Sequence, residues 1–198
     1  MIQRRSKSFS LDRLVKVAIL ASISYLLMFV QMPIPIAPPF MKVDLADVPA
    51  LIGGFAMGPW YGVLIQLIKN VLNLSKTMTG GVGELSNFVV GSTFVLVSSL
   101  IYRNKKTRKN SVLALVLGIV AMSAVATLSN AFVVFPIYGE VMNLELEAFV
   151  AMIPGNNLVS NYFTMMVFAV APFNLIKGAV EAIITQLLYK RISPILKF

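Results

Sequence analysis

Long apolar segments separated by short polar ones constrain this chain more than any other feature of its sequence. They lie at about residues 14–32, 46–57, 60–74, 85–102, 111–135 and 163–188. Hydrophobic residues make up 58% of the chain and charged residues 13%, whereas soluble domains have roughly 45–50% and 25%. Because a spanning helix needs about 20 apolar residues, we expect an all-α membrane protein with six transmembrane helices in one integral membrane domain, residues 1–198.

Basic residues gather in three clusters that flank the apolar segments. The clusters hold 13 of the 17 Lys and Arg residues, namely Arg4, Arg5, Lys7, Arg13 and Lys16, then Arg103, Lys105, Lys106, Arg108 and Lys109, and finally Lys190, Arg191 and Lys197. The positive-inside rule places such clusters in the cytoplasm, so we expect both termini there and a multi-pass protein of the cell membrane. No aromatic residues interleave the basic runs, which argues against a nucleic-acid surface.

Prolines and glycines divide the first half of the chain. Four prolines between Pro33 and Phe40 predict an ordered outer loop, since proline cannot propagate a helix. The Gly58-Pro59 pair predicts two short helices instead of one long one. A cleaved signal peptide is disfavoured, because the first apolar segment exceeds the usual 7–15 residues and no small-residue cleavage site follows it.

Acidic residues fall mostly on loops that this topology places outside. Six of the eight are in this group, namely Asp44, Asp47, Glu84, Glu140, Glu145 and Glu147. The positive-inside rule counts Lys and Arg only, so this bias is supporting evidence for the orientation.

Lys177 is the most informative polar residue inside an apolar segment. It precedes Lys190 by 13 residues, roughly 20 Å along a helix, which is too far for its side chain to reach the cytoplasmic end. It stands four residues before Glu181 and three after Asn174. Two interpretations are therefore open, a structural ion pair with Glu181 or a ligand contact made together with Asn174.

Asn87 and Asn130 lie near the outer ends of their apolar segments. A membrane asparagine is about as often a helix-to-helix contact as a ligand contact. Together with Asn174 and Lys177, however, they predict a small polar-edged pocket in the outer half of the bundle. Amide groups and one ammonium suit a planar, uncharged, carbonyl-rich ligand better than a metal ion, which prefers carboxylates.

Enzyme chemistry has little support in this composition. The chain has no cysteine and no histidine, which removes thiol nucleophiles and the commonest acid–base group. Gly80, Gly81 and Gly83 precede Glu84 and do not form a phosphate-binding loop, so ATP hydrolysis is not expected. We expect no enzyme activity, no metal and no cofactor, and any uphill transport must draw its energy from elsewhere.

Small residues at Ala18 and Ser22, with Ala21 beside them, would let another helix approach the first span closely. This pair could serve docking of a partner, or ordinary packing inside the protein.

Several motifs together resemble the riboflavin-specific S component of energy-coupling factor transporters. They are Lys42-Val-Asp-Leu-Ala-Asp-Val-Pro-Ala-Leu-Ile-Gly-Gly-Phe, Gly58-Pro-Trp-Tyr-Gly, Ile68-Lys-Asn, Gly83-Glu-Leu-Ser-Asn-Phe and Pro172-Phe-Asn-Leu-Ile-Lys-Gly. The resemblance covers nearly the whole chain in the same order. It implies six helices, an outer loop at 33–43 that acts as a gate, and a vitamin bound near the outer surface.

The resemblance also implies particular residues and partners. Its ligand contacts are Met41, Val43, Asn87, Asn130, Asn174 and Lys177. Its docking motif, Ala-xxx-Ala in the family, reads Ala18-xxx-Ser22 here. The implied function is capture of riboflavin for an ATP-driven importer whose other parts are a transmembrane coupling protein and two ATPase subunits. The alternatives are an S component for another water-soluble vitamin and an ion-coupled secondary transporter, with a membrane enzyme a distant third.

Overall fold

The structure is a computed structural model that describes residues 11–77, 79–153 and 156–196. Its α-helices are α1 (Leu11–Leu27), α2 (Asp47–Met57), α3 (Pro59–Asn73), α4 (Val82–Asn104), α5 (Arg108–Ser129), α6 (Phe135–Met142), α7 (Leu146–Ala151), α8 (Tyr162–Met165) and α9 (Ala171–Leu196). A 3-10 turn, η1 (Leu74–Lys76), follows α3, and two π-helical turns, η2 (Asn130–Val134) and η3 (Met166–Val170), follow α5 and α8. The basic residues Arg4, Arg5, Lys7 and Lys197 lie outside the described residues.

Among the described residues, three helical stretches have the length and apolar composition to cross a membrane, namely Val82–Asn104, Arg108–Met142 and Tyr162–Ile192. The π turns make the second and third stretches continuous, since each joins two α-helices without a break. Their outer faces carry exposed apolar side chains such as Val120 and Leu187. Such faces are expected to contact lipid, which agrees with the predicted all-α membrane fold.

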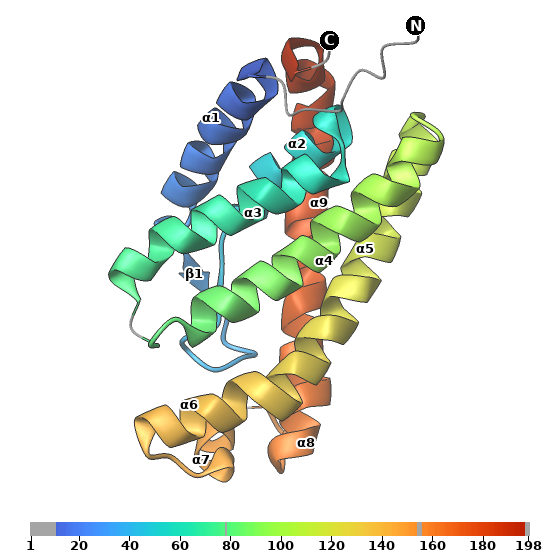
Figure 1. The fold of residues 1–198 in the computed structure, drawn as a ribbon. Helices are drawn as coiled ribbons and strands as arrows, with labels where there is room; N and C mark the ends of the chain where they lie inside the picture. The colour runs from blue at the N-terminus through green and yellow to red at the C-terminus, as the bar shows by residue number, and fades with distance from the viewer. Residues whose placement is uncertain (1–10, 78, 154–155, 197–198) are drawn as a thin grey trace, which may run out of the picture.

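The helices form a bundle with two distinct ends (Figure 1). The start of α1, the turn between α4 and α5, and the last turns of α9 lie toward one end. The helices α6, α7 and α8 lie at the opposite end. The basic residues Arg13, Lys106 and Lys190 belong to the first end, so the described members of the three basic clusters share one side of the molecule.

The Gly58-Pro59 pair divides α2 from α3 as predicted. Gly58 has a φ of 121°, a conformation that favours glycine, and Pro59 starts α3, where its missing N–H costs no hydrogen bond. The two helices have 11 and 15 residues, about 16 and 22 Å long. Both are shorter than the roughly 30 Å hydrocarbon core of a bilayer.

The structure differs from the sequence-based expectations at several segment ends. The first helix ends at Leu27 and not at Met32, because Met32–Pro33 form β1, which pairs antiparallel with β2 (Lys42–Val43). The fifth apolar segment, expected to end near residue 135, continues as a helix to Met142, and α7 follows it.

Two of the expected outer-loop carboxylates lie on helices. Asp47 is the first residue of α2 and is 1% exposed. Glu84 lies in the first turn of α4, where it accepts hydrogen bonds from Asn73 and Thr77. Assigning both to loops was wrong, because nearby donors and a cation let a helix bury a carboxylate.

Two hydrophobic clusters fill the bundle. One lies toward the basic end and includes Leu51, Phe55 and Phe94. The other is aromatic and lies among α6, α7 and α8, with Phe135, Tyr138, Phe149 and Tyr162 at its centre. These last four residues are named the outer aromatic cluster below.

Candidate ligand-binding site

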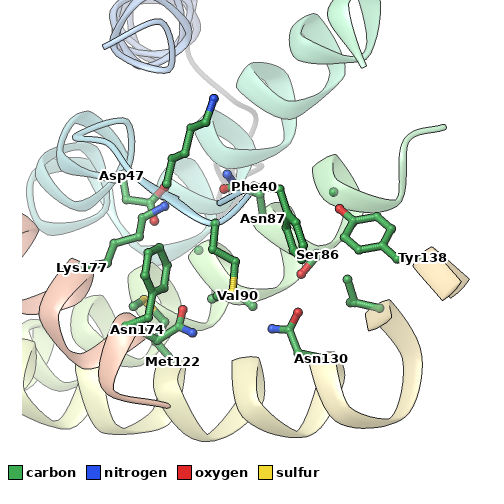
Figure 2. A pocket seen from close by; sticks show the side chains of 16 residues that line it. Phe40, Asp47, Ser86, Asn87, Val90, Met122, Asn130, Tyr138, Asn174 and Lys177 are labelled. Atoms are coloured by element: carbon green, nitrogen blue, oxygen red, sulfur yellow. The ribbon is translucent and has the colours of Figure 1, made fainter. Parts of the chain in front are cut away.

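A cavity of about 160 Å³ opens between the loop that precedes α2 and the helices α4, α5, α6 and α9 (Figure 2). Its lining residues are Phe40, Met41, Lys42, Asp47, Gly83, Ser86, Asn87, Val90, Gly91, Met122, Asn130, Val134, Tyr138, Phe173, Asn174 and Lys177. The lining combines apolar and aromatic surfaces with a few amide, hydroxyl and charged groups. This mixture is typical of sites that hold a small organic molecule and fix its orientation.

Five of the six predicted contact residues line this one cavity. They are Met41, Asn87, Asn130, Asn174 and Lys177, which come from four separate parts of the chain. The sixth, Val43, does not line it and lies half-buried in β2. The structure therefore brings the asparagines and the lysine together, and leaves Val43 beside the cavity.

Asn130 and Asn174 present their amides in a similar way. The Nδ2 atom of Asn130 donates to the carbonyl of Ala126 at 2.7 Å, and that of Asn174 donates to the carbonyl of Val170 at 2.8 Å. Each bond occupies a donor and leaves Oδ1 available to accept. Asn130 opens η2, and Asn174 follows η3 by one turn. Such π-helical turns are frequent at functional sites, where they reorient side chains.

Asn87 differs from the other two asparagines. It lies half-buried on α4, and its side chain makes no hydrogen bond to any residue within the described parts of the chain. Both its donors and its acceptor are therefore available to a molecule in the cavity.

Lys177 has a nearer partner than the one considered from the sequence. Its Nζ atom lies 3.3 Å from Oδ2 of Asp44 and 3.9 Å from Oε1 of Glu181. Asp44 also accepts the backbone N–H of Ala46 at 2.8 Å, which orients its carboxylate at the start of α2. The pair with Glu181 exists, but Asp44 provides the hydrogen-bonded contact.

The Lys177 side chain also lines the cavity. It is 11% exposed, and in Figure 2 it points toward Asp47, another residue of the cavity wall. The same side chain therefore forms the ion pair with Asp44 and lines the cavity. Its partner Asp44 lies 133 residues away in the sequence, so no local pattern could have revealed it.

A second buried cluster lies next to this site and was not predicted. Lys69 of α3 forms an ion pair with Asp47, which also accepts a hydrogen bond from Nε2 of Gln66 at 2.9 Å. Lys69 is 0% exposed. Gln66, Lys69 and Asn70 stand within an apolar stretch of the sequence, and the rule that polar residues in spans carry functions could have found them.

Phe40 connects the loop before α2 to the outer aromatic cluster. Its ring centroid lies 5.6 Å from those of Phe135 and Tyr138 and 6.0 Å from that of Phe149. Edge-on contacts of this kind stabilise a packed position by about 0.5–1.5 kcal/mol each. The loop therefore lies against the outer helices and forms part of the cavity wall.

Ala18 and Ser22 both lie on the exposed face of α1, whereas Ala21 is fully buried. The Ser22 hydroxyl donates to the Ala18 carbonyl at 2.9 Å, which turns its polar group back onto the helix. Packing inside the protein therefore explains the small size of Ala21, but it does not explain the small sizes of Ala18 and Ser22. Ala18 and Ser22 leave a shallow apolar stripe on the surface.

Comparison with known proteins assigns the family. The family model described as "ECF transporter, substrate-specific component" matches residues 12–189. The chain is 35% identical to the riboflavin transporter RibU of Staphylococcus aureus, over 93% of this chain and 92% of that protein. It is 30% identical to the riboflavin transporter FmnP of Bacillus subtilis, over 92% of both chains.

A solved structure agrees with these relatives. It is described as the S component of a bacterial ECF transporter, and it superimposes with a TM-score of 0.74 at 33% identity, covering 94% of this chain and 98% of that one. The family consists of transport subunits and not of enzymes. The chain therefore belongs to the substrate-specific S components of energy-coupling factor (ECF) transporters.

Proposed function

We propose that this protein binds riboflavin in the cavity of Figure 2 and serves as the capture subunit of an ATP-driven vitamin importer. The observation that carries the proposal is the convergence of Asn87, Asn130, Asn174 and Lys177 on one cavity. Relatives that are named riboflavin transporters support the choice of vitamin.

The polar groups of the cavity match the edge of a flavin ring, which has carbonyl acceptors and a ring N–H donor. The Lys177 ammonium and the Asn87 amide can donate to the carbonyls. The free Oδ1 atoms of Asn130 and Asn174 can accept the N–H. Phe40, Phe173 and Tyr138 provide aromatic surface for the ring faces.

Binding requires the loop at 33–43 to move. The cavity volume is about 160 Å³, whereas pockets for small organic ligands have roughly 300–1,000 Å³. Phe40, Met41 and Lys42 form one wall of the cavity and belong to this short connecting segment. We therefore assign the segment the role of a gate that opens to admit the vitamin and closes over it.

The first test is the colour and affinity of the purified protein. Protein purified in detergent should carry a flavin absorbance spectrum, and flavin-free protein should quench riboflavin fluorescence on titration. Binding of a different water-soluble vitamin together with no effect of riboflavin would contradict the assignment of the substrate.

A second proposal concerns topology. The chain has six membrane-embedded helical segments with both termini in the cytoplasm, and its basic clusters provide the support. The short α2 and α3 each cover only part of the bilayer. Since the chain has no native cysteine, single cysteines at positions 76, 106 and 145 can be labelled cleanly. We expect labelling from outside intact cells at 76 and 145, and labelling at 106 would contradict the orientation.

A third proposal concerns the partner. An ECF module, made of a transmembrane coupling protein and two ATPase subunits, docks on the exposed Ala18 and Ser22 stripe of α1. Ala18→Trp and Ser22→Trp should abolish riboflavin uptake in cells while leaving flavin affinity unchanged. Ile23→Trp changes a neighbouring exposed residue off this stripe and should retain uptake. Equal loss of uptake in all three variants would contradict the docking role.

The energy source separates this proposal from an ion-coupled transporter. Uptake into proteoliposomes that contain this protein and its partners should require ATP. Accumulation of riboflavin by this protein alone, driven by an ion gradient, would overturn the proposed importer.

A further inference from the structure

An apolar groove runs along the outside of the bundle where α5 packs against α9. Its volume is about 350 Å³, and its walls are Val112, Leu115, Val116, Ile119, Ala179, Ala182, Ile183, Gln186 and Leu187. The buried side chains of Leu115 and Ala182 form its floor, and exposed residues such as Val116 and Ile183 form its rims. The groove is named the α5–α9 groove below. Since both helices belong to membrane-length stretches, this groove faces lipid.

A cationic cavity lies at the basic end of the same two helices. Its volume is about 510 Å³, and it is lined by Tyr102, Lys106, Thr107, Arg108, Ser111, Gln186, Leu187, Tyr189 and Lys190. Three of these side chains are cations, and all three are exposed. Within the described parts of the chain, none of Lys106, Arg108 and Lys190 forms an ion pair. The cavity therefore has a positive charge that no carboxylate among the described residues neutralises.

The groove and the cavity adjoin each other, because Gln186 and Leu187 line both. Oε1 of Gln186 accepts a hydrogen bond from the Ser111 hydroxyl at 2.9 Å. Its Nε2 atom donates to no residue in the part of the chain that the structure describes. The Nε2 donor of Gln186 therefore lies at the boundary between the apolar groove and the cationic cavity. The N-terminal end of α5, which begins at Arg108, adds the positive end of a helix dipole.

The geometry points to a site for one anionic phospholipid. An acyl chain would lie in the α5–α9 groove, the ester region would meet Gln186, and the phosphate would lie among Lys106, Arg108 and Lys190. Free phosphate would leave the groove empty, and a zwitterionic lipid would leave the cations uncompensated. The inference requires only that α5 and α9 cross the membrane. It does not depend on which vitamin the cavity of Figure 2 binds.

Lipid titrations of the purified full-length protein test this inference. Delipidated protein is titrated with phosphatidylglycerol or phosphatidylcholine, and bound lipid is counted by native mass spectrometry while thermal unfolding is followed. We expect one phosphatidylglycerol to remain bound and to raise the unfolding temperature, whereas phosphatidylcholine does not. A basic side chain near a lipid surface contributes about 1 kcal/mol, so Arg108→Gln and Lys190→Gln should each weaken phosphatidylglycerol binding roughly fivefold.

Matched variants distinguish a specific lipid-binding site from non-specific attraction between anionic lipid and basic side chains. Lys109→Gln removes an equal charge from the same segment outside the cavity and should bind phosphatidylglycerol like the wild type. Ala179→Trp fills the groove without changing charge and should weaken binding, whereas Ala124→Trp, on the exposed face of α5, should not. The site is rejected if Lys109→Gln weakens binding as much as Arg108→Gln does. It is also rejected if phosphatidylcholine or inorganic phosphate alone stabilises the protein equally.

Riboflavin quenching by the same variants separates the two proposals. Arg108 and Lys190 lie far from the residues that line the cavity of Figure 2, so their substitution should leave flavin affinity unchanged. Lost lipid binding with intact flavin binding supports the lipid site. Failure of flavin binding in the wild type overturns the proposed function alone.

Discussion

Among the described residues, Lys69 and Lys177 are both buried in the interior of the bundle, but their surroundings differ. Lys69 is 0% exposed and forms an ion pair with Asp47, whose carboxylate also binds Gln66. Lys177 also has a carboxylate partner, Asp44, but it borders the ligand cavity and has a second carboxylate, Glu181, at 3.9 Å. Lys69 does not line the cavity.

From this comparison we propose that Lys69 serves stability and that Lys177 serves ligand binding. An ammonium that is enclosed by protein groups can only hold helices together, and here it joins α3 to α2. An ammonium at a cavity wall can also donate a hydrogen bond to a ligand carbonyl while it keeps its carboxylate partner. Asp44 stands directly after β2 and before α2, so the Lys177 pair also connects the segment between β2 and α2 to α9.

The largest expected effect follows from removing the enclosed lysine. Lys69→Met leaves the Asp47 carboxylate buried without its cation, so the free energy of unfolding should fall by about 3–5 kcal/mol. Thermal unfolding of the detergent-purified protein measures this. The double variant Lys69→Met with Asp47→Asn removes both charges and should recover much of the stability, which keeps the test decisive if the single variant does not purify. If Lys69→Met is as stable as the wild type, the proposed role of Lys69 in stability is wrong.

The next effect concerns Lys177 and appears in affinity. A hydrogen bond from a charged donor contributes about 1.5–3 kcal/mol, so Lys177→Met should weaken riboflavin binding by roughly 10- to 150-fold. Fluorescence quenching gives the dissociation constants. Unfolding temperatures should change less than for Lys69→Met, because Asp44 keeps its bond to the Ala46 N–H.

A double variant tests whether Lys177 acts only through its ion pairs. Lys177→Met with Asp44→Asn removes the lysine together with its nearest carboxylate, and Lys177→Met with Glu181→Gln removes it together with the other. If Lys177 contacts the ligand, neither combination restores affinity. Recovery to wild-type affinity in either one would show that Lys177 only neutralises a carboxylate.

The smallest effect is expected for the amide acceptors. Neutral hydrogen bonds contribute roughly 0.5–1.5 kcal/mol, so Asn130→Ala and Asn174→Ala should each weaken riboflavin binding by about 2- to 12-fold. Asn157→Ala changes an exposed asparagine outside the cavity and should have no effect in the same titration. A loss in Asn174→Ala as large as that in Lys177→Met would indicate that this segment of α9 acts as one unit.

Much of the fold could be predicted from short windows of sequence. Segment hydropathy located most of the helices, and Gly58-Pro59 located the break between α2 and α3. The ends were less accurate where tertiary contacts compete with local preference. Pairing between β1 and β2 ends the first helix early, and a π turn carries the fifth apolar segment on to Met142.

The candidate site was predicted in part. Asn87, Asn130, Asn174 and Lys177 stood out because polar groups inside apolar segments are costly, and the structure brings them to one cavity. Met122, Val134 and Tyr138 line the same cavity without any distinguishing sequence signal. The residue types are ordinary for helices of this kind, so only their position in the bundle selects them.

The sequence by itself determined the membrane class, the number and approximate limits of its apolar segments, and the polar residues that such segments must accommodate. These properties depend on composition and spacing along a few turns of chain. Only the tertiary structure decided that Lys177 pairs with Asp44, that Lys69 pairs with Asp47, and that Val43 lies beside the cavity. The physical reason is that a buried charge takes whichever opposite charge packing brings near, and packing joins segments 133 residues apart that no local pattern connects.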